Sequence, residues 1–142
     1  MNKPIRVLIL CTGNSARSQM AEGLLRHDGN QSFDVESAGI EPTSVRAEAV
    51  VVMREIGIDI AGHRSKSIDE FMGREFDHVI TVCDNANERC PVFPGNVKRI
   101  HWSFEDPAAR IGKEVERLDV FRRIRDEIRE RLRQFLSESL HR

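Results

Sequence analysis

The stretch that decides the fold is residues 5–18, which reads IRVLILCTGNSARS. Residues 5–10 form a short, mostly apolar run that stops abruptly at a polar, glycine-containing loop. A helical pattern follows, because Ala16, Met20 and Leu24 are spaced four residues apart. A strand, a tight loop and a helix in this order are the usual opening of a parallel α/β fold.

The rest of the chain continues this alternation. Short apolar runs predict three more strands, over residues 33–38, 78–83 and 97–102. Apolar residues at helical spacing predict a helix over residues 45–56, capped by Gly57, and a long amphipathic helix over residues 118–140. We therefore expect a single domain over residues 1–142, an open four-stranded parallel sheet with helices on both faces. In such sheets ligands bind at the carboxyl ends of the strands, where Cys11 and Cys83 fall.

Composition excludes several classes of protein. The 142 residues carry 22 Lys and Arg against 23 Asp and Glu, a net charge of -1, which is unlike a nucleic-acid binder. No apolar run reaches the roughly 20 residues of a membrane helix, and residues 7–10 are too short for a signal peptide. We expect a cytoplasmic monomer. In the cytosol three cysteines, an odd number, point to catalytic, redox or metal-binding roles rather than structural disulfides.

Residues 11–18 have the form C-x5-R-S, and each part suits a tetrahedral oxyanion. Backbone N–H groups in a loop that enters a helix attract anions, and glycine and asparagine tolerate the positive φ that turns such groups inward. Arg17 offers a planar fork for two oxygens. The same positive potential stabilises a thiolate at Cys11, to which the hydroxyl of Ser18 or Ser15 can donate. The predicted oxyanion-binding residues are Thr12, Gly13, Asn14, Ser15, Ala16, Arg17 and Ser18.

The place of this motif, directly between a strand and a helix, favours a reactive site over a buried cysteine beside an ordinary turn. The longer string of residues 11–23, CTGNSARSQMAEG, resembles the low-molecular-weight tyrosine phosphatase superfamily and, within it, the thioredoxin-coupled arsenate reductase branch. The resemblance covers nearly the whole chain; one departure is Ala16, where relatives often carry a further cysteine. It implies a phosphatase-like, flavodoxin-like topology and the reduction of arsenate to arsenite, with weak phosphatase activity.

The segment Phe104 to Pro107 resembles the Asp-Pro loop of that family, in which the aspartate protonates the leaving oxygen. The resemblance assigns this role to Asp106, with Glu105 as the alternative; an ordinary turn is the other interpretation. Phosphatases of the superfamily usually hold the substrate ring with aromatic residues after this dipeptide. Here Ala108 and Ala109 follow, and the chain has no tyrosine, which favours a small inorganic anion.

Two further cysteines, Cys83 and Cys90, flank a polar segment whose composition suggests mobility. The resemblance implies a relay: a Cys11–Cys83 disulfide forms as arsenite leaves, Cys90 converts it to Cys83–Cys90, and thioredoxin reduces the product without any bound cofactor. Cys90 would reach Cys83 by partial unfolding of residues 84–95. The alternatives are a core cysteine with an incidental loop thiol, or a zinc site, for which C-x6-C is not a usual spacing.

Some relatives bind potassium beside the loop through Asn, Glu, Ser and Asp side chains. Asn14, Glu22 and Ser37 match this set, but Lys66 stands after Ser65, where the aspartate is expected. We therefore predict no bound metal. The remaining candidates are interpreted as structural or surface residues, namely His63, His78, His101 and Trp102.

Two competing functions remain open at this point. One is a phosphatase that acts on phosphotyrosine, since the same loop can perform that chemistry. The other is a non-catalytic oxyanion or redox sensor, although the chain offers no extension for signalling. The expected partners are arsenate and thioredoxin, and neither nucleic acid nor a membrane.

Overall fold

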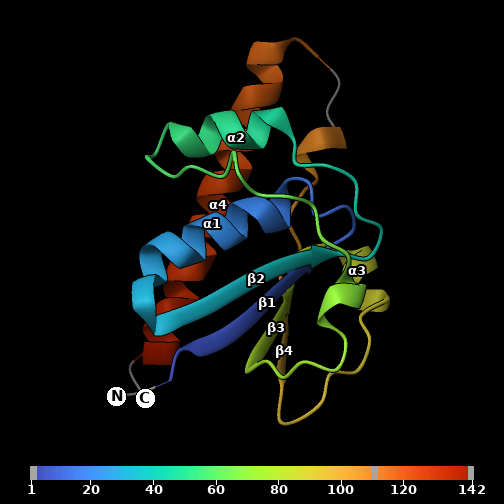
Figure 1. The fold of residues 1–142 in the computed structure, drawn as a ribbon. Coiled ribbons are helices and arrows are strands. Elements are labelled where there is room, and N and C mark those ends of the chain that lie inside the picture. The colour runs from blue at the N-terminus through green and yellow to red at the C-terminus, as the bar shows by residue number, and fades with distance from the viewer. Residues whose placement is uncertain (1–2, 110–111, 141–142) are drawn as a thin grey trace.

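The computed structural model of the chain describes residues 3–109 and 112–140. Within them, four parallel strands form one open sheet in the order β2-β1-β3-β4 (Figure 1). This arrangement confirms the predicted sheet. The strands are β1 (Ile5–Cys11), β2 (Phe33–Gly39), β3 (His78–Thr81) and β4 (Lys98–His101).

The helices lie on both faces of the sheet, as predicted. They are α1 (Arg17–Gly29), α2 (Ala47–Arg54), α3 (Asp84–Glu88) and α4 (Glu114–Leu140), with 3-10 turns at Asn30–Ser32, Ile68–Phe71 and Pro107–Ala109. Helices α1 and α2 pack against α4 on one side (Figure 1). The short α3 and the turn at Ile68–Phe71 lie on the other side.

Several features differ from the prediction. Helix α2 ends at Arg54 rather than at residue 56, and α4 begins at Glu114 rather than at residue 118. Helix α2 begins at Ala47 rather than at residue 45, because the residues before it are extended and bond to the loop that follows β1. The polar segment after β3 begins with α3, which the sequence did not predict. Cys83 is the N-terminal cap residue of this helix, so β3 ends at Thr81 instead of continuing to residue 83.

The hydrophobic core contains both faces of strand β1 and one side of helix α4. The four residues of β1 from Val7 to Leu10 are all 0% exposed. Helix α4 buries five apolar or aromatic side chains, Phe121, Ile124, Ile128, Leu132 and Phe135. Trp102 is buried and meets the Phe135 ring edge-on, with 6.1 Å between the centroids, which confirms it as a core residue.

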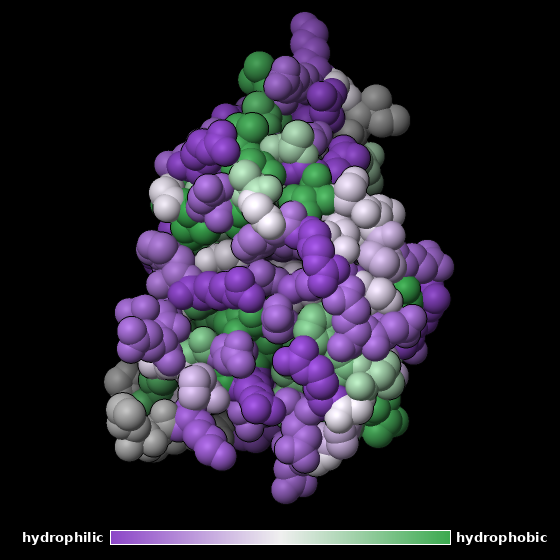
Figure 2. Space-filling view, in the orientation of Figure 1, coloured by the Kyte–Doolittle hydropathy of each residue, from purple (hydrophilic) through white to green (hydrophobic). Residues whose placement is uncertain are grey.

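One face of the molecule can be described by its hydropathy. The face in Figure 2 is predominantly hydrophilic, and apolar side chains gather toward the end where α2 and the start of α4 lie. Exposed Val51 and Val115 belong to these two helices. Among the helices that the structure describes, none is both long and apolar enough to cross a membrane.

Truncation of Ile128 tests the packing of α4. Ile128→Ala removes a fully buried side chain and should lower the free energy of unfolding by about 2–5 kcal/mol in urea denaturation. Val115→Ala, on the same helix but 68% exposed, should change it by no more than about 0.5 kcal/mol. Equal effects of the two changes would show that this face of α4 is not packed as described.

Candidate functional site

The predicted oxyanion loop connects the end of β1 to the start of α1. Cys11 is 2% exposed, and its Sγ lies 2.8 Å from Ser18 Oγ and 3.2 Å from the backbone N of Asn14. Ser18 Oγ also accepts a hydrogen bond from the Asn14 side-chain amide, so its own proton is available for the sulfur. Of the two hydroxyls considered from the sequence, Ser18 is therefore the one that contacts the thiol.

The backbone carbonyl groups of residues 11–15 all accept hydrogen bonds from residues outside the loop. Asn14 O accepts from Ser65 Oγ at 2.7 Å and from Gln19 Nε2 at 3.1 Å. The other four carbonyls accept from backbone N–H groups of the segment 40–46, at N···O distances of 2.8–3.1 Å. These hydrogen bonds run from Ile40 to Cys11, from Glu41 to Thr12, from Thr43 to Gly13 and from Arg46 to Ser15.

This outward bonding fixes where the N–H groups point. The described peptide bonds are all trans, so a carbonyl that points outward forces the next N–H to point inward. The Asn14 N–H follows this rule, since it points at Cys11 Sγ. Within the described residues, the N–H groups of Thr12, Gly13, Ser15 and Ala16 donate to no protein acceptor. The loop is thus a concave set of donors around the Cys11 sulfur, which suits a tetrahedral oxyanion.

Asn14 is the residue that lets the chain turn. It adopts φ of 50°, it is fully buried, and its side-chain Oδ1 accepts from the Lys66 N–H at 2.8 Å. Gly13 does not use a positive φ, contrary to the conformational role considered for it from the sequence. Its small size matters instead, because a Cβ there would lie 3.1 Å from Thr43 Oγ1.

Sequence reasoning missed the role of Gly39 at the end of β2. A Cβ at this position would lie 2.6 Å from Thr12 O and 2.9 Å from Asn14 N. The backbone of β2 therefore touches the back of the loop, and only glycine leaves room for it. The one sequence feature that could have indicated this role is that Gly39 is the residue directly after the predicted strand over residues 33–38.

Arg17 and Asp106 face each other across the opening of the loop. Arg17 Nη2 lies 3.9 Å from Asp106 Oδ2, and Arg17 Nη1 donates to the carbonyl of Phe104 at 3.0 Å. Glu105 points instead toward α4, where it pairs with Arg123 at 3.2 Å. Of the two carboxylates considered as the acid, Asp106 is therefore the one beside the loop, and its side chain is partly exposed to solvent.

The second cysteine lies against the same loop. Cys83 is buried, and its Sγ lies 3.4 Å from Thr12 Oγ1. The Asn85 side-chain amide donates to that same oxygen at 2.9 Å, which leaves the Thr12 proton free to point at the sulfur. The neighbouring positions of β1 and β3 in the sheet explain how residues so distant in the sequence meet here.

The third cysteine is not at the loop. Cys90 follows α3, is half-buried, and its Sγ contacts the carbonyl of Pro91 at 3.5 Å. Burial raises the pKa of the Cys90 thiol, and the positive charge of Arg99 opposes that effect. All three cysteines are free thiols in this structure.

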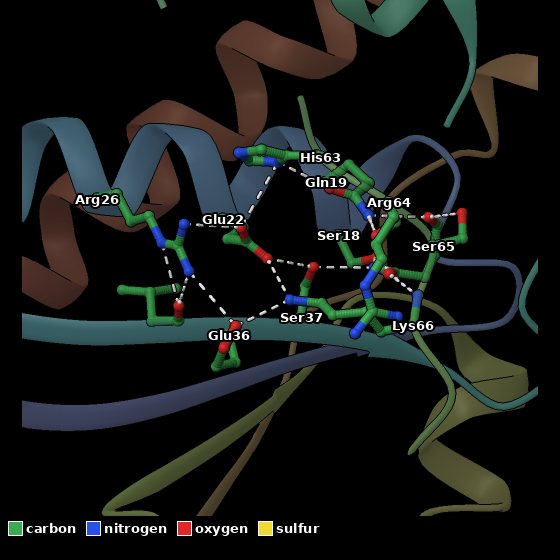
Figure 3. A network of polar contacts seen from close by, with 12 residues as sticks. Ser18, Gln19, Glu22, Arg26, Glu36, Ser37, His63, Arg64, Ser65 and Lys66 are labelled. Carbon is green, nitrogen blue, oxygen red and sulfur yellow. Dashed lines mark hydrogen bonds and ion pairs between the residues drawn. The ribbon is translucent and has the colours of Figure 1, made fainter. Parts of the chain in front are cut away.

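A network of polar side chains supports the loop from behind (Figure 3). Glu22 on α1 is 2% exposed and accepts from Ser37 Oγ at 2.6 Å. The Lys66 ammonium lies 3.3 Å from Glu22 and 2.8 Å from Glu36, so a protein cation stands beside the carboxylate that was considered as a potassium ligand. Arg26 completes the charge balance, 3.3 Å from Glu22.

The histidines lie in structural contacts. His63 meets Gln19 Oε1 at 2.9 Å, and burial lowers the pKa of its imidazole. His78 packs edge-on against the Phe135 ring, and His101 bonds to neighbouring side chains at the end of β4. The described residues contain no cluster of three or more His, Cys, Asp or Glu side chains arranged for a metal ion.

The contact at Gly39 gives a test of the loop geometry. Gly39→Ala should force the loop away from β2 and weaken the binding of inorganic phosphate by about tenfold or more, measured by isothermal titration calorimetry. Gly62→Ala is the matched control, because a Cβ at Gly62 meets nothing within 4 Å. Unchanged phosphate affinity in Gly39→Ala would contradict the described contact.

Comparison with known proteins agrees with this geometry. The family model of low molecular weight phosphotyrosine protein phosphatases matches residues 6–142. The arsenate reductase of Halalkalibacterium halodurans is 47% identical over 135 residues, which cover 95% of this chain and 96% of that protein.

Solved structures give the same assignment. An arsenate reductase in a phosphate-binding state superimposes with a TM-score of 0.78 at 32% identity, covering 94% of this chain and 98% of that one. A thioredoxin-dependent arsenate reductase of Corynebacterium glutamicum gives 0.71 at 27% identity, covering 98% of this chain and 65% of that one. The chain therefore belongs to the low molecular weight phosphotyrosine protein phosphatase family, and within it to the group that contains the arsenate reductases.

Proposed function

We propose that this protein reduces arsenate to arsenite through Cys11, Cys83 and Cys90, with electrons from thioredoxin. The similarity to arsenate reductases and to a thioredoxin-dependent relative supports the reaction and its electron donor. The single observation that carries the proposal is the 3.4 Å contact between Cys83 Sγ and Thr12 Oγ1. A phosphatase needs no second thiol at its anion loop, whereas a reductase does.

In the first step the Cys11 thiolate attacks the arsenic of an arsenate bound by the loop. The loop N–H groups and the Arg17 guanidinium bind the arsenate oxygens and stabilise the charge that develops on them. An S–As bond forms and one As–O bond breaks. Asp106 gives its proton to the departing oxygen, which leaves as water. Ser18 Oγ, 2.8 Å from the sulfur, donates a hydrogen bond to the attacking thiolate.

In the second step the Cys83 thiolate attacks Cys11 Sγ. A Cys11–Cys83 disulfide forms as the S–As bond breaks, and the electron pair of that bond stays with arsenic. Arsenic is thereby reduced from the +5 to the +3 state, and arsenite leaves. The Thr12 hydroxyl stabilises the Cys83 thiolate for this attack.

In the third step the Cys90 thiolate attacks Cys83 Sγ, and Cys11 leaves as a thiolate. The disulfide moves to Cys83–Cys90 without a net change in oxidation state, and the dithiol of thioredoxin then reduces it. A disulfide needs Cα atoms within about 7 Å of each other. Helix α3 lies between these two cysteines, so we propose that residues 84–95 rearrange to bring the thiols together.

A phosphatase is the second candidate, because the family and the Arg17–Asp106 pair favour it. The absence of tyrosine, and Ala108 and Ala109 after the Asp-Pro pair, argue against an aryl substrate. We propose only weak aryl phosphatase activity. We also propose that no potassium ion binds beside the loop, because the Lys66 ammonium already neutralises Glu22.

A coupled assay tests the three-cysteine reaction. Arsenate should drive NADPH oxidation in the presence of thioredoxin and thioredoxin reductase, and Cys83→Ser or Cys90→Ser should each abolish steady turnover. Cys90→Ser should still release one arsenite for each protein, because the first disulfide does not need Cys90. Aryl phosphate hydrolysis that requires Cys11 alone, without arsenate turnover, would make the protein a phosphatase.

The raised pKa of Cys90 predicts how the third step depends on pH. The attacking species is the thiolate, so below the raised pKa the rate of Cys83–Cys90 formation should increase about tenfold for each pH unit. Quenched-flow alkylation and mass spectrometry of the disulfides after one turnover measure this rate. Arg99→Gln removes the opposing positive charge and should slow the step at neutral pH. A rate that is flat between about pH 6.5 and 8.5 would contradict this assignment.

A further inference from the structure

His101, at the end of β4, connects the core of the sheet to the start of α3. Its Nδ1 lies 2.8 Å from Thr81 Oγ1, and its Nε2 lies 2.9 Å from Asp84 Oδ1. Thr81 is a buried residue of β3, whereas Asp84 is the first residue of α3 and is exposed. The imidazole thus fixes the exposed beginning of a short helix to the rigid sheet.

The donors and acceptors of this contact follow from its chemistry. A carboxylate can only accept, so His101 Nε2 carries a proton and donates it to Asp84. In the neutral imidazole Nδ1 is then an acceptor, and the Thr81 hydroxyl donates to it. The hydrogen bond from His101 is also the main cause that lowers the pKa of Asp84, followed by one from Ser103.

The Thr81 hydroxyl has one proton, which it donates to His101 Nδ1, so Asn87 Oδ1, 3.5 Å from Thr81 Oγ1, lies near this contact without taking part in it. We call Thr81, Asp84 and His101 the α3 clasp. Because α3 has only five residues, its own backbone hydrogen bonds provide little stability, and contacts such as these decide whether it stays ordered.

We propose that His101 is a positioning residue, which holds α3 through Asp84 and thereby keeps the Cys83 thiol against Thr12 in the reduced protein. Cys83 is the residue directly before Asp84 and caps this helix, so the position of its sulfur depends on the first turn. The clasp favours attack of Cys83 on Cys11 and delays the rearrangement that brings Cys90 to Cys83. This use of Cys83 rests on the proposed function, whereas the clasp itself does not.

The reduced protein without arsenate gives the first test. His101→Ala should increase the rate at which iodoacetamide alkylates Cys83, followed by peptide mass spectrometry, by about threefold or more. Amide hydrogen exchange of residues 84–88 should accelerate with it. His101→Gln should restore both rates, because its amide N–H can still donate to Asp84.

His27→Ala is the matched control, since His27 is a more exposed imidazole that bonds Asp28 at 3.0 Å on α1, away from α3. It should leave Cys83 alkylation and the exchange of residues 84–88 unchanged. Wild-type rates in His101→Ala, or a failure of His101→Gln to restore them, would overturn the proposal.

A second measurement links the clasp to the reaction. In the Cys90→Ser background, which stops after the first disulfide, His101→Ala should slow the single release of arsenite by about threefold or more, and His101→Gln should restore it. An unchanged release rate would overturn the role in the reaction. Faster alkylation in His101→Ala, together with no arsenite release by the wild type, would support the clasp and overturn the proposed function.

Discussion

The structure depends on one constraint, the outward direction of the carbonyl groups in the loop after β1. Five successive carbonyls, from Cys11 to Ser15, accept hydrogen bonds from residues outside the loop. Planar trans peptides then turn the N–H groups toward the Cys11 sulfur. The segment 40–46 runs along the loop in an extended path, because four of its N–H groups donate to the loop carbonyls before α2 begins at Ala47. An anion site built from backbone groups therefore requires a second segment that is as precisely positioned as the loop.

The order of the strands explains why two of the cysteines lie at the anion loop and the third does not. Since β1 and β3 are neighbours in a parallel sheet, their carboxyl ends bring Cys11 and Cys83 to the same edge. Cys90 lies beyond α3, so the helix that positions one thiol also separates it from the other. The proposed reaction first needs Cys83 beside Cys11 and then needs Cys90 beside Cys83. We propose that α3, which has only five residues and few backbone hydrogen bonds, is stable enough to position Cys83 and weak enough to rearrange when Cys90 attacks.

The sequence predicted features that are encoded locally. The β1 run, the motif at residues 11–18 and the helix after it are contiguous, so their pattern was sufficient. Gly39 and Ser65 could not be assigned to the loop, because their contacts join segments far apart in the chain. Helix α3 was missed because it has five residues, of which only Ala86 is apolar, so it shows no apolar periodicity. Lys66 was recognised because its charge differs from the expected aspartate, although its second partner, Glu36, was visible only in the structure.

The buried carboxylate of Glu22 is connected to the Cys11 sulfur through hydrogen bonds. An unpaired carboxylate at this buried site would cost several kcal/mol, and here Lys66 and Arg26 provide the opposite charge. Ser37 donates to Glu22 and accepts from the Asn14 side chain, which also donates to Ser18 beside the Cys11 sulfur. A continuous chain of hydrogen bonds thus joins the buried charge to the reactive thiol. The orientation of the Asn14 amide, and with it the proton that Ser18 offers to the sulfur, is therefore determined by a charge balance on the far side of the loop.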